Sequence, residues 1–438
     1  MSEWTTKPLK DVAEIRSSNV DKKSNPGEQP IRLCNYMDVY SHEYITKSID
    51  FMEATATSAE IDRFGIERGD VMITKDSETP DDIGISAVVI DEIPNLVCGY
   101  HVALIKPNRK EIEPIYLAKQ LSTVDSSRYF GRLANGSTRY GLAYGAIANT
   151  PIRWAPLVQQ QRIAEILSTL DEAIEQTEAL IAKTQQIRAG LMHDLFTRGV
   201  TKDGQLRPAR EEAPHLYKES PLGWIPKEWA SSPLGTMSEI VSGVTLNGDA
   251  SSGEIEVPYL RVANVQDGFL DLSDVKTIKI TPEQLSKLTL RSGDVLMNEG
   301  GDFDKLGRGT VWNDEIIPCV HQNHVFRVRP SSELLRSQFL AYWSQSEFGK
   351  KYFILNSKQS TNLASINSTQ LHRFPIARID LSEQSAIETR LFTVDSQTEK
   401  FRDGLCKLLQ VRHGLMHDLL TGRVRVPNES TTPSSAHV

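Results

Sequence analysis

The chain has 438 residues, of which 39% are hydrophobic and 24% charged, and its formal net charge is −8 at pH 7. This length suffices for two or three domains with ordinary globular cores. No stretch approaches the roughly 20 consecutive apolar residues of a membrane span, and no apolar signal core follows the start. The four cysteines are scattered without a C-x-x-C pair, which fits a reducing compartment. We therefore predict a cytoplasmic protein that binds no membrane.

One order of landmarks runs twice through almost the whole chain. The hexapeptide Gly190-Leu191-Met192-His193-Asp194-Leu195 recurs 224 residues later as Gly414-Leu415-Met416-His417-Asp418-Leu419. Other pairs keep this spacing to within one residue: Trp4 with Trp229, Pro8-Leu9 with Pro233-Leu234, Gly69-Asp70-Val71-Met72 with Gly293-Asp294-Val295-Leu296, His101-Val102 with His324-Val325, Ser137-Thr138 with Ser360-Thr361, Ile163 with Ile387, Asp171 with Asp395, and Arg188 with Arg412. This is one tandem duplication, because a solenoid repeats every 20–50 residues.

The predicted elements follow the duplication. Residues 1–156 carry short strand patterns such as Val71-Met72-Ile73 and a helical pattern from Pro114 to Leu121. A long helical segment (157–200) comes next, and then a linker (201–228) rich in Pro, Gly and charge. The same succession returns as a second domain (229–378), a second helix (379–426) and a disordered tail (427–438). The expected fold is mixed α/β (α+β): two globular domains in tandem duplication, separated by two long antiparallel coiled-coil helices.

Each long helix carries an apolar stripe that favours packing along another helix. Counting from Ile163 as heptad position a, the next position, d, falls three residues later. The residues we expect in the helix–helix contact are Ile163, Ile166, Leu170, Leu180, Ile187 and Leu191 in the first helix, and Ile387, Val394, Phe401, Leu408 and Leu415 in the second. An amphipathic helix lying on its own domain is the alternative, and it is weakened because the pattern ends both copies.

These landmarks resemble the specificity subunits of Type I restriction-modification systems (the HsdS family) over essentially the whole chain. Gly223-Trp224-Ile225-Pro226-Lys227-Glu228-Trp229 is similar to the start of second target-recognition domains in that family. Pro156-Leu157 through Gln160-Gln161-Arg162-Ile163, and Asp380-Leu381-Ser382-Glu383-Gln384, are similar to the motif P-L-x-E-Q-x-x-I that begins its helices.

The resemblance implies a non-catalytic, sequence-specific DNA-binding subunit. Each recognition domain would read one half of a bipartite, asymmetric target in double-stranded DNA, and the helices would set the gap between the halves. The implied partners are two methyltransferase (modification) subunits and two restriction/motor subunits. S-adenosylmethionine, ATP and Mg would belong to those partners, so we expect this chain to bind no cofactor. The net charge is mildly unfavourable to a lone DNA binder, but phosphate contacts need only a local basic face.

The sequence lacks the motifs of a self-contained enzyme. It has neither the Asn/Asp-Pro-Pro-aromatic motif of an adenine methyltransferase nor a G-x-x-x-x-G-K-[ST] phosphate loop. Cys319, His321 and His324 are too few and too isolated for a structural zinc site, which normally has four ligands, so we expect no metal. Two alternatives stay open: a self-contained methyltransferase or nuclease, and a scaffold that spaces proteins without reading DNA.

Side chains that read base edges carry amide or guanidinium groups, and side chains that hold phosphates are Lys, Arg, Ser and Thr. Polar loops with these residue types occur at matching places in both copies. The DNA-binding candidates are Lys75, Ser77, Ser137, Thr138, Arg139 and Tyr140 in the first domain, and Asn298, Lys305, Arg308, Gln322, Asn323, Lys358, Gln359, Ser360, Thr361 and Asn362 in the second.

Overall fold

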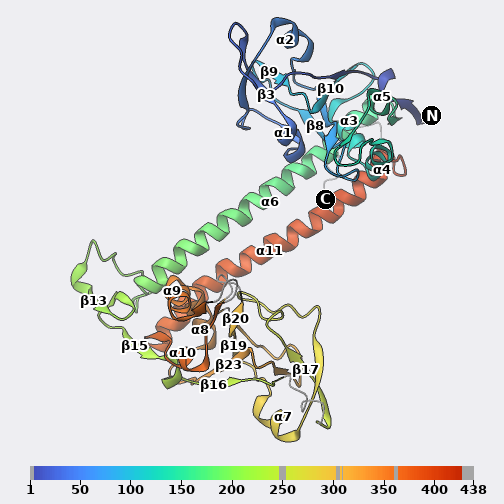
Figure 1. Cartoon of the computed structure of the whole chain (residues 1–438). Coiled ribbons are helices and arrows are strands. Elements are labelled where there is room, and N and C mark those ends of the chain that lie inside the picture. Colours follow the sequence, from blue (N-terminus) through green and yellow to red (C-terminus); the bar gives the residue numbers. More distant parts are fainter. Residues whose placement is uncertain (1–3, 246–252, 302–305, 308, 360–363, 427–438) are drawn as a thin grey trace, which may run out of the picture. The chain divides into compact units, whose positions relative to one another are not determined.

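The computed structural model describes residues 4–245, 253–301, 306–307, 309–359 and 364–426 (Figure 1). Contacts divide the chain into two compact units, Met1–Ala179 with Asp403–Val438, and Leu180–Arg402. Each unit therefore holds one globular domain and parts of both long helices. In the described ranges, no helix is both long enough and apolar enough to cross a membrane.

The globular domain of the first unit contains two sheets that share a core. The larger sheet has the order β2-β10-β6-β8-β4, and the smaller has the order β5-β3-β9. A cluster of buried side chains, including Leu33, Val97 and Leu104, joins the two. The strands are β2 (Ala13–Ser17), β3 (Gln29–Cys34), β4 (Tyr44–Ile45), β5 (Met52–Ala56), β6 (Val71–Thr74), β8 (Ser86–Val89), β9 (Leu96–Cys98) and β10 (Val102–Pro107).

Short helices and two small ladders complete this domain. The helices are α1 (Tyr36–Ser41), α2 (Ser58–Phe64), α3 (Pro114–Leu121), α4 (Val124–Leu133), α5 (Tyr144–Ala148) and the 3-10 turn η1 (Leu9–Asp11). The ladders pair β1 (Thr5–Pro8) with β12 (Pro151–Trp154), and β7 (Asp76–Ser77) with β11 (Tyr140–Gly141). The β1–β12 pair lies just before the first long helix and so joins both ends of the domain at one place.

The domain of the second unit repeats this order of strands. Its larger sheet is β16-β23-β19-β21, which corresponds to β2-β10-β6-β8, and its smaller sheet is β18-β17-β22. The strands and helices are β15 (Ala230–Pro233), η3 (Leu234–Thr236), β16 (Ser238–Ser242), β17 (Ile255–Leu260), β18 (Lys276–Ile280), α7 (Pro282–Leu288), β19 (Val295–Asn298), β20 (Gly300–Gly301), β21 (Gly309–Val311), β22 (Val320–His321), β23 (Val325–Pro330), α8 (Ser337–Gln345), α9 (Glu347–Asn356), β24 (Lys358–Gln359), β25 (Ala364–Ser365), α10 (Ser368–His372) and β26 (Pro375–Arg378). The predicted mixed α/β fold and tandem duplication are confirmed.

The repeated Gly-Asp-Val motif begins the central strand of each larger sheet. Asp70 accepts a hydrogen bond from the backbone N–H three residues earlier, at 2.9 Å, and an ion pair from Lys106 at 2.8 Å. Asp294 does the same, with a backbone bond of 2.8 Å and an ion pair to Arg329 at 2.6 Å. Both aspartates are buried. The motif is therefore part of the scaffold and leaves its carboxylates unavailable to a ligand.

The segment 201–228 is more ordered than the linker that its composition predicts. It contains the turn η2 (Pro214–Leu216) and a hairpin of β13 (Tyr217–Ser220) with β14 (Gly223–Pro226). Arg207 is buried and binds Glu383 at 2.5 Å and Glu228 at 2.7 Å. This fixed guanidinium and the buried side chains of the hairpin hold the segment against the rest of the second unit.

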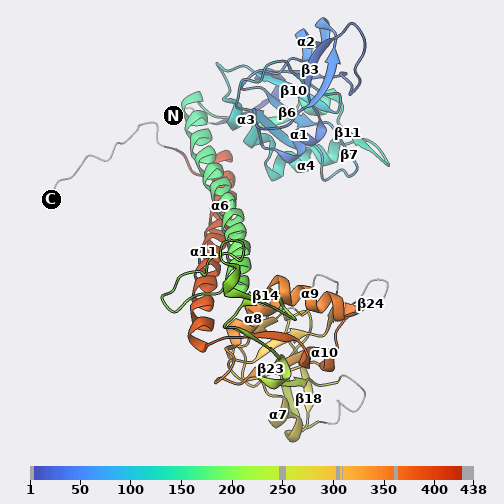
Figure 2. The ribbon, with the colours of Figure 1, turned by 90° about the vertical axis from the view of Figure 1, so that its left-hand side faces the viewer.

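The two long helices, α6 (Leu157–Thr197) and α11 (Leu381–Leu420), pack antiparallel (Figures 1 and 2). Arg188 of α6 binds Asp395 of α11 at 2.5 Å, and Asp171 of α6 binds Arg412 of α11 at 2.7 Å. Asp171 precedes Arg188 in α6 by as many residues as its partner Arg412 follows Asp395 in α11, as antiparallel packing requires. The two ion pairs are also copies of one another, since their members are 224 residues apart in the chain.

Each long helix has a glutamine in its first turn, and the two glutamines make the same bonds. The buried Gln160 amide donates to the carbonyl groups of Glu111 and Ala155 and accepts from the N–H of Glu113. Gln384 repeats this with Leu334, Ile379 and Arg336. A single amide thus satisfies backbone groups of the domain and of the helix start, which explains why the motif recurs.

Counted from position a, the buried residues of the helices lie four and then three residues apart. The prediction had them three and then four residues apart. Ile163 and Ile387 at position a are fully buried, and Ile166, Leu170, Leu191, Val394, Phe401, Leu408 and Leu415 are partly buried. However, Leu180 is 44% and Ile187 50% exposed, so both were wrongly placed in the contact. The covered side chains lie four residues after each a position, as at Leu167, Leu391 and Thr398.

The contact between α6 and α11, here called the seam, can be tested by its effect on stability at two neighbouring residues of α6. Ile181 is partly buried whereas the adjacent Leu180 is exposed. Ile181→Ala should lower the free energy of unfolding by about 1–2 kcal/mol, because a partly buried side chain loses part of its transfer energy. Leu180→Ala should cost less than about 0.5 kcal/mol. Urea unfolding monitored by circular dichroism makes the measurement. A larger loss of unfolding free energy for Leu180→Ala than for Ile181→Ala would favour the predicted three-then-four spacing.

Candidate nucleic-acid interface

In the first domain, the candidate loops meet where the central strand β6 ends. β7 follows β6 directly and pairs with β11, so that Ser77 lies opposite Tyr140. The N–H of Leu142 donates to the carbonyl of Lys75 at 2.8 Å, which ties the two segments together. Ser137, Thr138 and Arg139 form the exposed tip of the loop that leads into β11. The structure therefore brings the backbone of Lys75 to the end of the 137–140 loop, while its ammonium donates to the carbonyl of Ser18 at 3.3 Å.

The second domain repeats this arrangement with a longer hairpin. β20 follows the central strand β19 and pairs with β25, which in turn pairs with β24. Lys358 of β24 is exposed, and Gln359 pairs with Ala364 through the backbone. Gln322 and Asn323 lie in the loop just before β23 and are partly exposed. Ser360, Thr361, Asn362, Lys305 and Arg308 lie outside the described residues.

Two of the sequence-predicted contacts are buried, which contradicts a surface role. Asn298 is only 2% exposed, and its amide donates to the carbonyl of Val265 at 2.9 Å. Ser77 is 6% exposed, and its hydroxyl accepts the N–H of Thr79 at 3.3 Å. Both residues belong to the strand ends that support the loops. Their polar side chains satisfy neighbouring backbone groups, and the sequence pattern could not distinguish this from an exposed position.

A histidine and a carboxylate pair beside these loops in each domain. In the first domain, His101 Nδ1 lies 2.7 Å from a carboxylate oxygen of Asp76. In the second, His324 Nδ1 lies 2.5 Å from a carboxylate oxygen of Glu299. Each histidine immediately precedes the strand next to the central strand, β10 or β23. Both rings therefore have a carboxylate partner at Nδ1.

The former zinc candidates are engaged separately. Cys319 is buried, and burial raises the pKa of its thiol to about 12. His321 is also buried, its Nδ1 lies 2.6 Å from the carbonyl of Val325, and burial lowers its pKa to about 4. Within the described ranges, no three His, Cys, Asp or Glu side chains are grouped as metal ligands.

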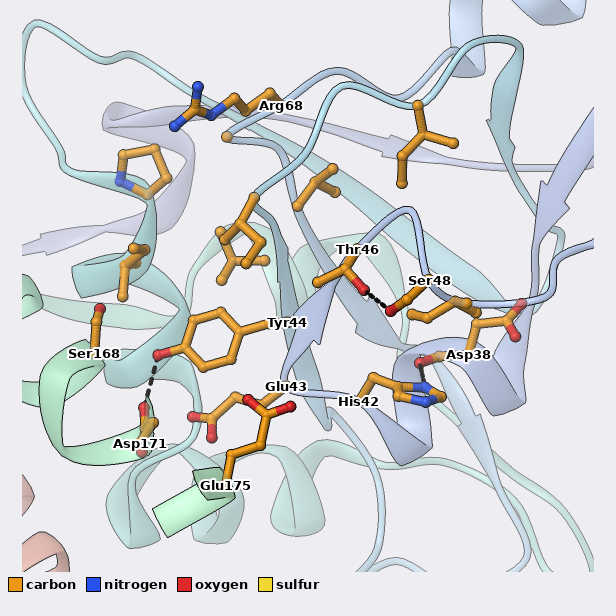
Figure 3. A pocket seen from close by; sticks show the side chains of 18 of the residues that line it. Asp38, His42, Glu43, Tyr44, Thr46, Ser48, Arg68, Ser168, Asp171 and Glu175 are labelled. Atoms are coloured by element: carbon orange, nitrogen blue, oxygen red, sulfur yellow. Dashed lines mark hydrogen bonds between the residues drawn. The ribbon is translucent and has the colours of Figure 1, made fainter. Parts of the chain in front are cut away.

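A cleft of about 1920 Å³ lies between the first domain and the helix segments of its own unit (Figure 3). Acidic groups outnumber basic groups along it, and Asp38, Glu43, Asp171 and Glu175 are among them. Such a lining repels the phosphates of DNA. We therefore place the candidate DNA surface at the strand-end loops and not in this cleft.

One wall of the cleft is a buried ionic network that the sequence did not reveal. Lys119 of α3 is 1% exposed and binds Glu43 at 2.5 Å as well as Asp171 of α6. Arg412 of α11 binds the same two carboxylates. The Tyr44 hydroxyl donates to Asp171 at 2.6 Å (Figure 3). Burial alone would raise the pKa of Asp171, but hydrogen bonds from Lys119 and Tyr44 hold that pKa below its ordinary value.

The second unit has the counterpart of this network. Asp395 of α11 accepts from Arg188 of α6 at 2.5 Å and from the Tyr342 hydroxyl of α8 at 2.9 Å. Arg188 also donates to Gln345 at 2.8 Å. The offset of Asp171, Arg412 and their partners was visible in the sequence, but a helical pattern does not show which domain residue meets the aspartate.

Comparison with known proteins agrees with this two-domain plan. A family model described as "Type I restriction modification DNA specificity domain" matches residues 1–186 and 226–404, once for each copy. The putative type I restriction enzyme MjaX specificity subunit of Methanocaldococcus jannaschii is 23% identical over 97% of this chain and 94% of its own length. The MjaVIII specificity subunit of the same organism is 28% identical over 64% of this chain, a match that spans 63% of that protein.

The fold is also found among solved structures. The crystal structure of the Type I restriction-modification S subunit from M. genitalium matches with a TM-score of 0.57 and 16% identity, covering 95% of this chain and 96% of that one. Two copies of a DNA specificity domain, each followed by a long helix, define the class of this protein. The chain belongs to the family of Type I restriction-modification specificity subunits.

Removal of the Asp171 carboxylate tests the ionic network. Asp171→Asn should lower the free energy of unfolding by about 3 kcal/mol near neutral pH, since it leaves buried Lys119 underpaired. Because the folded pKa of Asp171 is lowered, its contribution exists above the unfolded value of about 3.9 and disappears as pH falls through the folded pKa. The gap between wild type and variant should therefore shrink below about pH 4.

The control is Glu175→Gln, which changes an exposed carboxylate of the same helix in the same cleft. Its free energy of unfolding should stay within about 0.5 kcal/mol of wild type. Chemical denaturation at a series of pH values makes the comparison. Equal losses for the two variants would show that Asp171 acts only as a surface charge.

Proposed function

We propose that this chain is the DNA-reading subunit of a Type I restriction-modification complex. Subunits of this family are generally non-catalytic and assemble with other subunits of the system and with DNA. The observation that carries the proposal is the repeated placement of polar loops at the end of the central strand, at β7–β11 and at β20–β25–β24. Loops on a rigid scaffold can vary in sequence while the sheets keep their positions.

Each domain would read one half of a bipartite target, and the two halves would differ. At places that the duplication makes equivalent, the first domain has Tyr100 and Asn135 where the second has Asn323 and Lys358. Amide and guanidinium groups recognise different base edges in the major groove. Different side chains on equivalent loops therefore favour an asymmetric target over a palindrome.

The long helices would set the gap between the half-sites and bind the methyltransferase subunits. Ile187 on α6 and Val411 on α11 are 50% and 49% exposed and lie at equivalent positions of the duplication. Exposed apolar side chains at equivalent positions support two equivalent docking sites, one for each of two methyltransferase subunits. Two restriction/motor subunits would join in the complete enzyme.

S-adenosylmethionine would bind to the methyltransferase subunits, and ATP and Mg to the motor subunits. Two alternatives make different predictions. A self-contained enzyme would transfer methyl groups to DNA when the isolated chain is given S-adenosylmethionine. A scaffold that does not read DNA would bind the same partners without changing which sequences are modified.

Exchange of the first domain tests modular reading. Residues 1–156 end just before α6, so they can be replaced by the first domain of a relative that keeps a lysine and a glutamate at the places of Lys119 and Glu43. Only one half of the methylated target should change. Single-molecule sequencing of DNA modified by the reconstituted complex gives the result.

The matched control exchanges residues 229–378 and should change only the other half. If either exchange altered both halves, the domains would not be independent readers. If neither altered the target, the scaffold alternative would be favoured.

Lengthening both helices tests whether they set the gap. The Arg188–Asp395 pair sets the register of the two helices, so that the peptide bond after Thr184 in α6 lies opposite the peptide bond after Thr398 in α11. Seven residues inserted at both places add about 10.5 Å of helix and keep the stripe within about 20°. At 3.4 Å per base pair the preferred gap should lengthen by about three base pairs, with unchanged half-sites.

The measurement is methylation of a DNA library in which the gap varies. In the control, seven residues are inserted after Thr184 alone. This shifts Arg188 away from Asp395 and should lower the free energy of unfolding. A folded double insertion with the original gap preference would show that other contacts determine the spacing.

A further inference from the structure

The histidine–carboxylate pair is retained in both domains although the residues around it differ. His101 follows Tyr100, whereas His324 follows Asn323 at the equivalent place. The Tyr100 ring lies against the His101 ring with centroids 3.6 Å apart, while the Asn323 amide lies 3.5 Å from Nε2 of His324. The shared part is therefore the ring with its carboxylate, and the neighbours are the variable part.

Each pair lies at the base of the polar loops. Asp76 belongs to β7, the strand that pairs with β11. Glu299 receives backbone contacts from both sides: its N–H donates to the carbonyl of His324 at 2.9 Å, and its carbonyl accepts the N–H of Ile366 at 2.8 Å. The side chains are 18% exposed at His101 and 56% exposed at His324.

The bond at Nδ1 leaves the other ring nitrogen for a ligand. Among the residues that the structure describes, no hydrogen bond engages Nε2 of His101, and the contact of Asn323 with Nε2 of His324 is at the outer distance limit. A ring that donates from Nδ1 to a carboxylate and from Nε2 to a second acceptor is an imidazolium.

We propose that His101 and His324 each hold one phosphate of the DNA backbone and that Asp76 and Glu299 orient the two rings. This inference rests on the proposed function and assigns residues to it. A group common to both domains fits the part of the ligand that both half-sites share, which is the backbone. The residues that differ between the domains remain for the bases.

The test uses the full-length chain assembled with the methyltransferase subunits of its own system. Binding of the mapped target duplex is measured over a series of salt concentrations for wild type, His101→Gln and His324→Gln. Each variant should make the slope of log K against log salt shallower by about one. Affinity should fall by the same factor for the target and for duplexes with substituted half-sites.

His42→Gln and His372→Gln are the matched controls. These are exposed histidines of the same two domains, and their Nδ1 atoms bond the backbone carbonyl groups of Asp38 and Ser368. Their salt slopes should equal that of wild type. If a histidine variant melts at a lower temperature, Asp76→Asn and Glu299→Gln replace it, since they keep the ring and remove the carboxylate that orients it.

The outcomes separate the inference from the proposed function. An unchanged slope in the histidine variants, or in the carboxylate variants that replace them, with wild-type binding intact, overturns the inference. Loss of discrimination at one base pair without a change of slope also overturns it, because the histidine would then read a base. Failure of the wild-type complex to prefer any target would instead overturn the proposed function.

Discussion

An aspartate in the helix seam of each unit connects three elements at once. Asp171 binds Arg412 of the opposite helix and Lys119 of the domain, and Asp395 likewise binds Arg188 and Tyr342. Lys119 is buried and must keep its carboxylate partners, because an unpaired buried charge costs several kcal/mol. Each domain is therefore held to the helix segments of its own unit in one arrangement, and the loops depend on that arrangement for their position.

In both copies a residue of the domain binds the aspartate of the helix, but the chemical type of that residue differs. Lys119 brings a full positive charge to Asp171 and needs the additional carboxylate of Glu43, whereas Tyr342 brings a neutral hydroxyl to Asp395. The helix–helix ion pair is the same in both. Duplication thus preserved the contact between helices, while the contact between helix and domain diverged together with the domain.

A similar division separates scaffold from recognition surface. The glutamines at the helix starts and the buried Gly-Asp-Val aspartates repeat nearly bond for bond, since each satisfies backbone groups that every copy of the fold exposes. The loops after the central strands keep their pairing partners but not their side chains. Variation is tolerated there because little of the core depends on those side chains.

The sequence alone determined the duplication, the mixed α/β class, the two long helices and the positions of the polar loops, because repetition and periodicity are visible in one dimension. Only the tertiary structure decided which of two adjacent stripes is covered: Leu180 and Ile187 lie outside the seam although their spacing is helical. It also buried Asn298 and ordered the segment around Arg207. Spacing fixes which residues share a helix face, but burial depends on the partner that covers that face, and this is a property of the folded chain.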